Sequence, residues 1–107
     1  MSYTNILVSI EDSIATLTIS RPEVQNALNL ATVRECHAAL QTLAADASVG
    51  VLIITGAGDK AFVAGADIND IRARDLADGL AAINSSLFSV VERFPRPTIA
   101  AVNGFAL

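Results

Sequence analysis

A short apolar run, residues 51–55, places the strongest limit on the fold of this chain. It reads Val-Leu-Ile-Ile-Thr and is bounded by Gly50 and Gly56. A continuous apolar run of this length is typical of a strand that is buried on both faces. Such strands occur in sheets that helices cover on both sides, so the run predicts an α/β protein.

Two further strands are predicted before this run, at residues 5–11 and 14–20. In the second of them, Ala15, Leu17 and Ile19 alternate with polar residues, which is the period of two expected for a strand. The polar residues between the two segments predict an antiparallel hairpin. Because no Asn-Gly pair is present, the type of turn stays open.

Helical periodicity marks two segments of the chain. Residues 23–29 form a loop after Pro22, and Asn29 is suited to be the N-cap of the first helix. Its predicted apolar face is Leu30, Val33, His37, Leu40 and Ala44. Residues 75–94 predict a second, long helix, which Pro95 ends.

Residues 98–102 predict a last strand, followed by the turn signal Asn103-Gly104. The element order is therefore β-β-α-β-loop-α-β. A strand, helix, strand succession implies parallel pairing through a right-handed crossover. The chain stops at Leu107 on apolar residues just after a turn, and we therefore expect a truncated domain.

Composition excludes several classes of function. Of 107 residues, 52% are hydrophobic and 17% are charged, and the net charge is −4. Without a basic cluster, nucleic-acid binding has no support, and the longest apolar runs are too short to cross a bilayer. The single cysteine excludes an internal disulfide, and the chain has no basic, apolar leader, so a reducing cytoplasmic location is expected. The high apolar share suggests a surface that meets another segment or subunit.

The candidate functional stretch is residues 60–68, which are mostly small and carry few catalytic side chains. Asp67, followed three residues later by Asp70, has the pattern of a helix N-cap with negative charge in the first turn. The unpaired N–H groups at such an end favour negative charge. One interpretation is that backbone N–H groups here bind a developing oxyanion; the other is a tight loop that needs small residues.

Four segments together resemble the crotonase superfamily, also called the enoyl-CoA hydratase/isomerase family. They are residues 21–28 with Asn-Ala-Leu, the strand 51–56, residues 60–68 with Ala-Gly-Ala-Asp, and residues 97–107. They keep the family's order and span essentially the whole chain. The resemblance implies an α/β, crotonase-like spiral of β-β-α units, of which residues 1–107 are the N-terminal part, truncated at the C-terminal end. It also implies a homo-trimer or hexamer.

The implied reaction is the addition of water to 2-enoyl-CoA thioesters through an oxyanion-stabilised enolate. The backbone N–H of Ala66 would be one of two oxyanion donors. The second donor and two catalytic glutamates lie beyond Leu107 in the family, so the chain alone is expected to be inactive. Coenzyme A is part of the substrate, and neither a separate cofactor nor a metal is expected. The implied substrate-binding residues are Val24, Gln25, Ala27, Ala64, Gly65, Ala66, Asp67, Ile68 and Asn69.

Other interpretations stay open. The chain is alternatively part of an enoyl-CoA isomerase or another crotonase-type enzyme, or a non-catalytic fragment that binds coenzyme A. Glu23 and Asn69 occupy places that are often basic in the family, so contacts to coenzyme A from these positions would be weaker, or Arg72 or Arg74 would supply them. The segment around Val24 is otherwise an ordinary loop between a strand and a helix.

Three further residues have a structural interpretation. Asp67 is assigned to helix capping rather than to acid–base chemistry. His37, the only histidine, is predicted to be a packed core or interface residue, since it falls on the apolar face of a helix. Cys36 has only Arg34 as a nearby basic residue, which predicts a packed thiol rather than a nucleophile.

Overall fold

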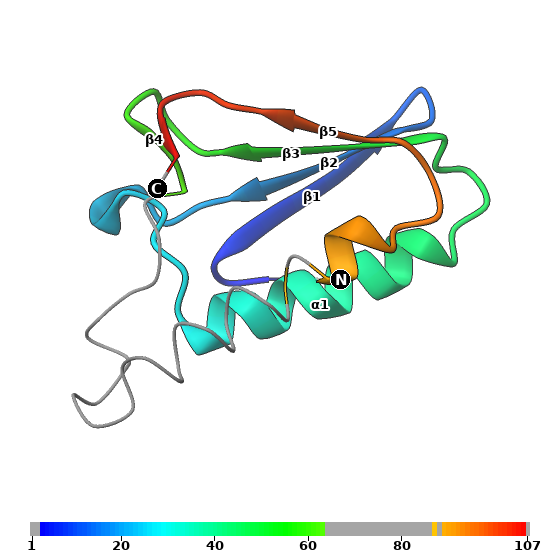
Figure 1. Cartoon of the computed structure of the whole chain (residues 1–107), viewed down its shortest axis with the longest axis horizontal. Coiled ribbons are helices and arrows are strands. Elements are labelled where there is room, and N and C mark those ends of the chain that lie inside the picture. The colour runs from blue at the N-terminus through cyan, green and yellow to red at the C-terminus, as the bar shows by residue number, and fades with distance from the viewer. Residues whose placement is uncertain (1–2, 64–86, 88, 107) are drawn as a thin grey trace.

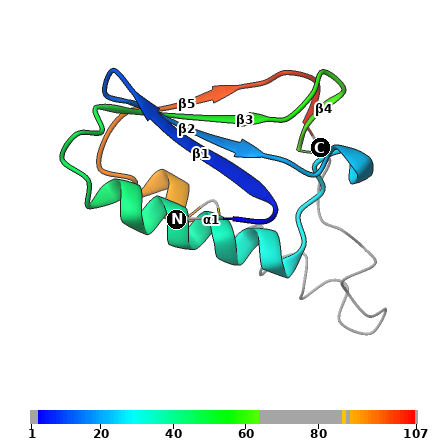
Figure 2. The ribbon, with the colours of Figure 1, turned by 180° about the vertical axis from the view of Figure 1, so that it is seen from behind.

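A computed structural model describes residues 3–63, 87 and 89–106. Its elements are β1 (Ile6–Glu11), β2 (Ile14–Ile19), a 3-10 turn (Pro22–Val24), α1 (Leu30–Ala44), β3 (Val51–Gly56), β4 (Ala61–Val63), β5 (Thr98–Ala101) and β6 (Phe105–Ala106). The main sheet has the order β1-β2-β3-β5, and β4 pairs with β6 in a second sheet. Figures 1 and 2 show α1 lying along one face of the main sheet.

The predicted hairpin is confirmed. β1 and β2 pair antiparallel, with Glu11 opposite Ile14. The two residues between the strands, Asp12 and Ser13, have φ angles of 53° and 66°. A positive φ at both central residues is the requirement of a type I′ turn, whose twist matches that of the strands. The hairpin therefore forms this turn without the usual Asn-Gly pair.

The parallel order is also confirmed. β2 pairs parallel with β3 and β3 pairs parallel with β5, with Ala15 beside Leu52 and Ile53 beside Ile99. The connection from β2 to β3 contains α1, which begins where the sequence predicts. The Asn29 side chain accepts a hydrogen bond of 2.8 Å from the backbone N–H of Thr32 and so caps the helix.

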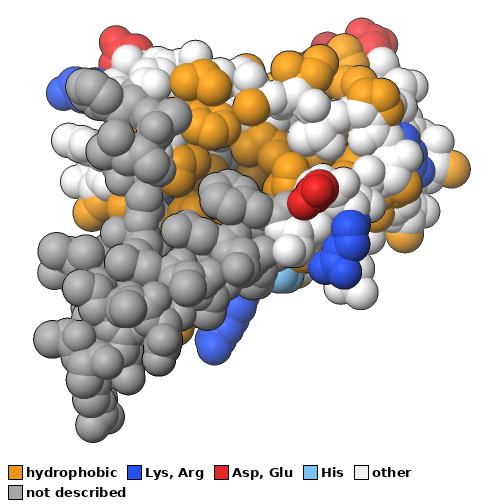
Figure 3. Space-filling model, viewed as in Figure 1, with side chains coloured by type: hydrophobic (Ala, Val, Ile, Leu, Met, Phe, Trp, Pro, Cys, Tyr) orange, Lys and Arg blue, Asp and Glu red, His pale blue; other side chains and the backbone are white. Residues whose placement is uncertain are grey.

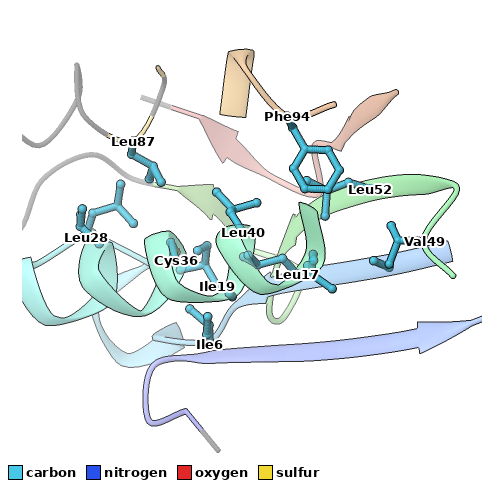
Figure 4. Close-up of a cluster of buried hydrophobic side chains, with 14 residues drawn as sticks. Ile6, Leu17, Ile19, Leu28, Cys36, Leu40, Val49, Leu52, Leu87 and Phe94 are labelled. Atoms are coloured by element: carbon cyan, nitrogen blue, oxygen red, sulfur yellow. The ribbon is translucent and has the colours of Figure 1, made fainter. Parts of the chain in front are cut away.

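The core lies between α1 and the inner face of the sheet (Figure 4). From the helix it takes Thr32, Val33, Cys36, Ala39, Leu40 and Leu43. From the strands it takes mainly Ile6, Leu17, Ile19 and Leu52. The predicted helix face was right for Val33 and Leu40 but wrong for Leu30, which is 45% exposed. Ala39, which the predicted face omitted, is buried, and its small side chain lets the helix lie close to the sheet. The spacing of large apolar residues alone does not predict this position.

The outer face of the main sheet is less covered than the sequence predicts. Leu52 is buried, but its neighbours Val51 and Ile53, which point to the outer face, are only half-buried. On the same face Leu7 is 60% exposed and Ile99 is 52% exposed. Figure 3 shows hydrophobic side chains at the surface over the strands. The prediction of burial on both faces is therefore wrong for this chain, because α1 covers only one of them.

Two predicted segments remain. The first differs from the prediction, and the second lies only partly within the described residues. Residues 60–68 were expected to be a loop leading into a helix, but Ala61–Val63 forms β4, which pairs parallel with β6. Of the predicted second helix, residues 75–94, the structure describes Leu87 and residues 89–94, and Leu87 and residues 89–92 are helical. Phe94 is buried against the core, and the helix ends before Pro95.

Candidate functional site

A pocket of about 210 Å³ lies where the turn after β2 meets the loop between β3 and β4. The first segment lies in the stretch 21–28 that the sequence singled out, and the second reaches the start of the stretch 60–68. The described lining residues are Pro22, Gln25, Asn26, Ala57, Gly58, Asp59, Lys60 and Ala61. The pocket therefore has two walls, residues 22–26 and residues 57–61.

The first wall is a tight turn that its own hydrogen bonds hold. The backbone N–H of Asn26 donates to the Arg21 carbonyl at 2.8 Å, and the N–H of Gln25 donates to the Pro22 carbonyl at 3.2 Å. The Arg21 guanidinium also donates to the carbonyl of Ala27. Gln25 and Asn26 have φ angles of 55° and 58°, a left-handed conformation that Asn tolerates better than most residues. The turn is thus a defined surface rather than a loose loop.

Asn26 joins the two walls. Its side chain is 1% exposed. The Nδ2 group donates to the carbonyls of Ala57, at 3.1 Å, and Ala61, at 2.8 Å, on the opposite wall. Its Oδ1 atom accepts the Arg21 backbone N–H at 2.8 Å. Every polar group of this buried amide therefore has a partner, as burial requires.

Asn103 holds the second wall from the far side. Its Nδ2 group donates to the carbonyls of Gly58, at 2.8 Å, and Ala61, at 3.1 Å. Its Oδ1 atom accepts the backbone N–H of Gly56 at 3.2 Å. The Asn103 side chain, from the predicted turn after β5, therefore reaches back to the loop before β4.

Two glycines make this close packing possible. A Cβ atom at Gly56 would lie 2.6 Å from the Ala61 carbonyl oxygen and 2.8 Å from Asn26 Nδ2. A Cβ atom at Gly104 would lie 2.8 Å from the Ala61 nitrogen and closer still to the Lys60 carbonyl. Real Cβ atoms do not approach other atoms so closely, so both positions require glycine.

The predicted site residues divide into two groups. Ala64, Gly65, Ala66, Asp67, Ile68 and Asn69 lie outside the described residues. Of the remaining three, Gln25 lines the pocket, whereas Val24 and Ala27 belong to the same turn but are not among the described lining residues.

Sequence reasoning did not assign a role to Asn26, Asn103 or Lys60. The available signal for Asn26 was its place inside the Asn-Ala-Leu motif, and for Lys60 its place at the start of the small-residue stretch. Asp59 and Lys60 are the charged residues among the described lining positions, and both are exposed. Apart from them the described lining residues are uncharged.

The other residues that the sequence considered for chemistry are structural or distant. Burial raises the pKa of the Cys36 thiol to about 12, and the Glu35 carboxylate adds to the effect. The prediction of a packed thiol is confirmed. His37 is half-buried and lines a separate pocket of about 300 Å³ between α1 and residues 90–95.

Among the residues that the structure describes, no group of three His, Cys, Asp or Glu side chains could hold a metal ion. No described helix combines the length and the apolar character needed to cross a membrane.

Comparison with known proteins connects these segments. Residues 9–107 match the profile of a family described as enoyl-CoA hydratase/isomerase. The chain is 44% identical over 110 residues to a crotonyl-CoA hydratase of Syntrophomonas wolfei, covering 100% of this chain and 42% of that protein. It is 38% identical to a short-chain-enoyl-CoA hydratase of Clostridium acetobutylicum, again covering 100% of this chain and 42% of the relative.

Solved structures agree with the sequence comparison. An enoyl-CoA hydratase from Bacillus anthracis superposes with a TM-score of 0.89 and 32% identity, over 96% of this chain and 41% of that one. The fold neighbours are therefore crotonase-type proteins, as the resemblance implied. The chain spans about two fifths of the length of these relatives.

Proposed function

Because the chain belongs to the enoyl-CoA hydratase/isomerase family, we propose that its protein adds water to 2-enoyl-CoA thioesters. The observation that carries this proposal is the match of the whole chain, at 38% and 44% identity, to proteins named as hydratases of this kind. The pocket between residues 22–26 and 57–61 supports it, because the first wall and residues 60–61 of the second wall come from segments that the family resemblance singled out.

The proposed chemistry centres on the thioester carbonyl. As the enolate forms, its oxygen would accept a hydrogen bond from the backbone N–H of Ala66 and one from a second donor. Each such donor is typically worth about 2.7–4 kcal/mol of transition-state stabilisation. In the family, the second donor and the two glutamates that handle water and the α-carbon proton lie past the position of Leu107. The 107-residue chain by itself is therefore expected to show no turnover.

Substrate binding is proposed to use the pocket described above. The coenzyme A portion would pack on Val24, Gln25 and Ala27, and on residues 64–69. Lys60 lines this pocket, and its ammonium group would favour the phosphates of coenzyme A, which would partly offset the acidic Glu23 at a position that is often basic. No cofactor beyond the coenzyme A of the substrate is proposed.

The location, pathway and oligomeric state of the protein are proposed from its family as well. We place the protein in the cytoplasm, in fatty-acid or related acyl-CoA degradation such as β-oxidation, as a homo-trimer or hexamer. An enoyl-CoA isomerase is the second candidate. The matched family profile covers both reactions, and in the family the acids and bases that distinguish the two reactions lie past the position of Leu107.

The decisive experiment measures hydration of crotonyl-CoA by the full-length protein, together with isothermal titration of acetoacetyl-CoA. Turnover and binding are expected. Ala66→Pro, which removes the proposed donor, should lower kcat about 10²- to 10³-fold. Ala66→Gly keeps the N–H group and is the matched control. A wild-type protein that neither hydrates crotonyl-CoA nor binds acetoacetyl-CoA would overturn the proposal, and an unaffected Ala66→Pro variant would overturn the assignment of Ala66.

A further inference from the structure

Two asparagine side chains converge on one backbone carbonyl beside the pocket. Asn26 Nδ2 donates to the Ala61 oxygen at 2.8 Å and Asn103 Nδ2 donates to the same oxygen at 3.1 Å. The partners lie 35 and 42 residues apart along the chain. A carbonyl oxygen has two lone pairs, so the two amides satisfy its full accepting capacity.

The two amides also hold the loop before Ala61 at separate points. Asn26 binds the Ala57 carbonyl and Asn103 binds the Gly58 carbonyl. Each is anchored to a different part of the fold through its oxygen, Asn26 to the turn at Arg21 and Asn103 to the end of β3 at Gly56. The loop is thus held between two fixed supports, one on the pocket side and one on the far side.

Few other hydrogen bonds of the described chain fix this loop, although Gly56 and Gly104 pack closely against residues 60–62. Outside the amide contacts, its backbone bond to the main sheet is the 2.8 Å bond from the Ala57 N–H to the Ile19 carbonyl. β4 that follows has only three residues, and its pairing with β6 is irregular between Ala61 and Val63. Short, irregular pairing contributes little rigidity. The position of this wall therefore depends on the side chains of Asn26 and Asn103.

We propose that Asn26 and Asn103 are positioning residues that act together on the Ala61 carbonyl to fix the wall formed by residues 57–61. This rests on the proposed function in one respect, since it takes the pocket to be where the coenzyme A portion of the thioester binds. Both amides hold the wall rather than the reacting carbonyl, so their loss affects KM more than kcat.

The test replaces each asparagine by aspartate in the full-length protein. Asp keeps the accepting oxygen towards Arg21 or Gly56 but presents a second oxygen to the carbonyls of the loop, which turns attraction into repulsion. For N26D and N103D, hydrogen–deuterium exchange of residues 57–63 should rise about tenfold, because each variant loses two hydrogen bonds to this wall. KM for crotonyl-CoA should also rise about tenfold, with kcat within about twofold of wild type. The double variant should fall short of the product of the two effects, because both residues act on one carbonyl.

Asn29→Ala is the matched control, because it removes an asparagine that caps α1 and does not contact the pocket. It should lower stability without changing KM or exchange in residues 57–63. Should N26D fail to fold, N103D and N103A carry the test, since Asn103 is only half-buried.

The outcomes separate this inference from the proposed function. Unchanged exchange in residues 57–63 of N103D overturns the inference whatever the enzyme does. Faster exchange with an unchanged KM overturns the link to binding, as does an equal rise of KM in Asn29→Ala. A wild-type protein without hydratase activity overturns the proposed function, while the exchange data still decide whether the two amides hold the loop.

Discussion

The thiol of Cys36 is packed between α1 and the sheet, and its pKa is raised to about 12. Because the folded state holds this proton more tightly than the unfolded chain, the stabilising effect is complete below about pH 9 and is lost as the pH rises towards 12. The free energy of unfolding should fall by about 1.4 kcal/mol per pH unit in that window. Denaturant titrations at several alkaline pH values measure this slope.

Cys36→Ala provides the control for this pH dependence. The variant should be less stable near neutral pH, because it loses packed atoms in the core. Its alkaline slope should be shallower than that of the wild type, since the other titrating groups are the same in both proteins. Parallel slopes in the two proteins would contradict the burial of the thiol as the cause.

At the level of elements, the N-cap of α1 is a local feature that the sequence predicts and the structure confirms. Asn29 Oδ1 accepts from the Thr32 N–H at 2.8 Å and from the Thr32 hydroxyl at 2.6 Å. Asn29→Ala should lower the free energy of unfolding by about 1 kcal/mol. Asn29→Ser, which can still cap, should recover most of that loss in chemical denaturation. An equal loss in both variants would show that the side-chain cap is not the cause.

The other end of α1 is held by a residue from a distant segment. Arg96 donates to the carbonyls of Ala44 and Asp46, each at 2.9 Å, and so satisfies backbone groups left open where the helix ends. Arg96→Ala should lower the free energy of unfolding by about 1–3 kcal/mol, because charged, part-buried donors are lost. Arg93→Ala is the control. Its guanidinium bonds the Ser89 carbonyl at an exposed position, so the change should stay within about 0.5 kcal/mol.

The elements also show why some features could be predicted and others could not. The hairpin, the cap at Asn29 and the strand at residues 51–56 depend on neighbours a few positions away, and local patterns contain that information. β4 and β6 are three and two residues long and pair across more than forty positions, so they carry no periodicity. The role of Asn103 depends on a carbonyl 42 residues earlier. The predicted donor Ala66 lies outside the described residues and stays a prediction.

At the scale of the whole molecule, the high apolar share of the sequence predicts a surface that meets another segment or subunit, and the outer face of the main sheet is the candidate for that surface. The apolar share of 52% is high for a chain of this length, and the structure places part of it on a face that α1 does not cover. Exposed apolar side chains of β1 and β5 lie on this face, with threonines of β2 and β3 between them. Exposed apolar side chains of this kind favour association.

The 107-residue chain should therefore self-associate through this face. Sedimentation velocity over a range of concentrations should show species larger than the monomer. Leu7→Thr combined with Ile99→Thr should shift the distribution towards monomer, because both side chains are more than half exposed on the outer face and threonine keeps the strand propensity. Leu30→Gln is the control, since Leu30 is an exposed hydrophobic residue on α1, away from the sheet face. A monodisperse wild-type monomer, or an equal shift in Leu30→Gln, would show that this face does not drive association.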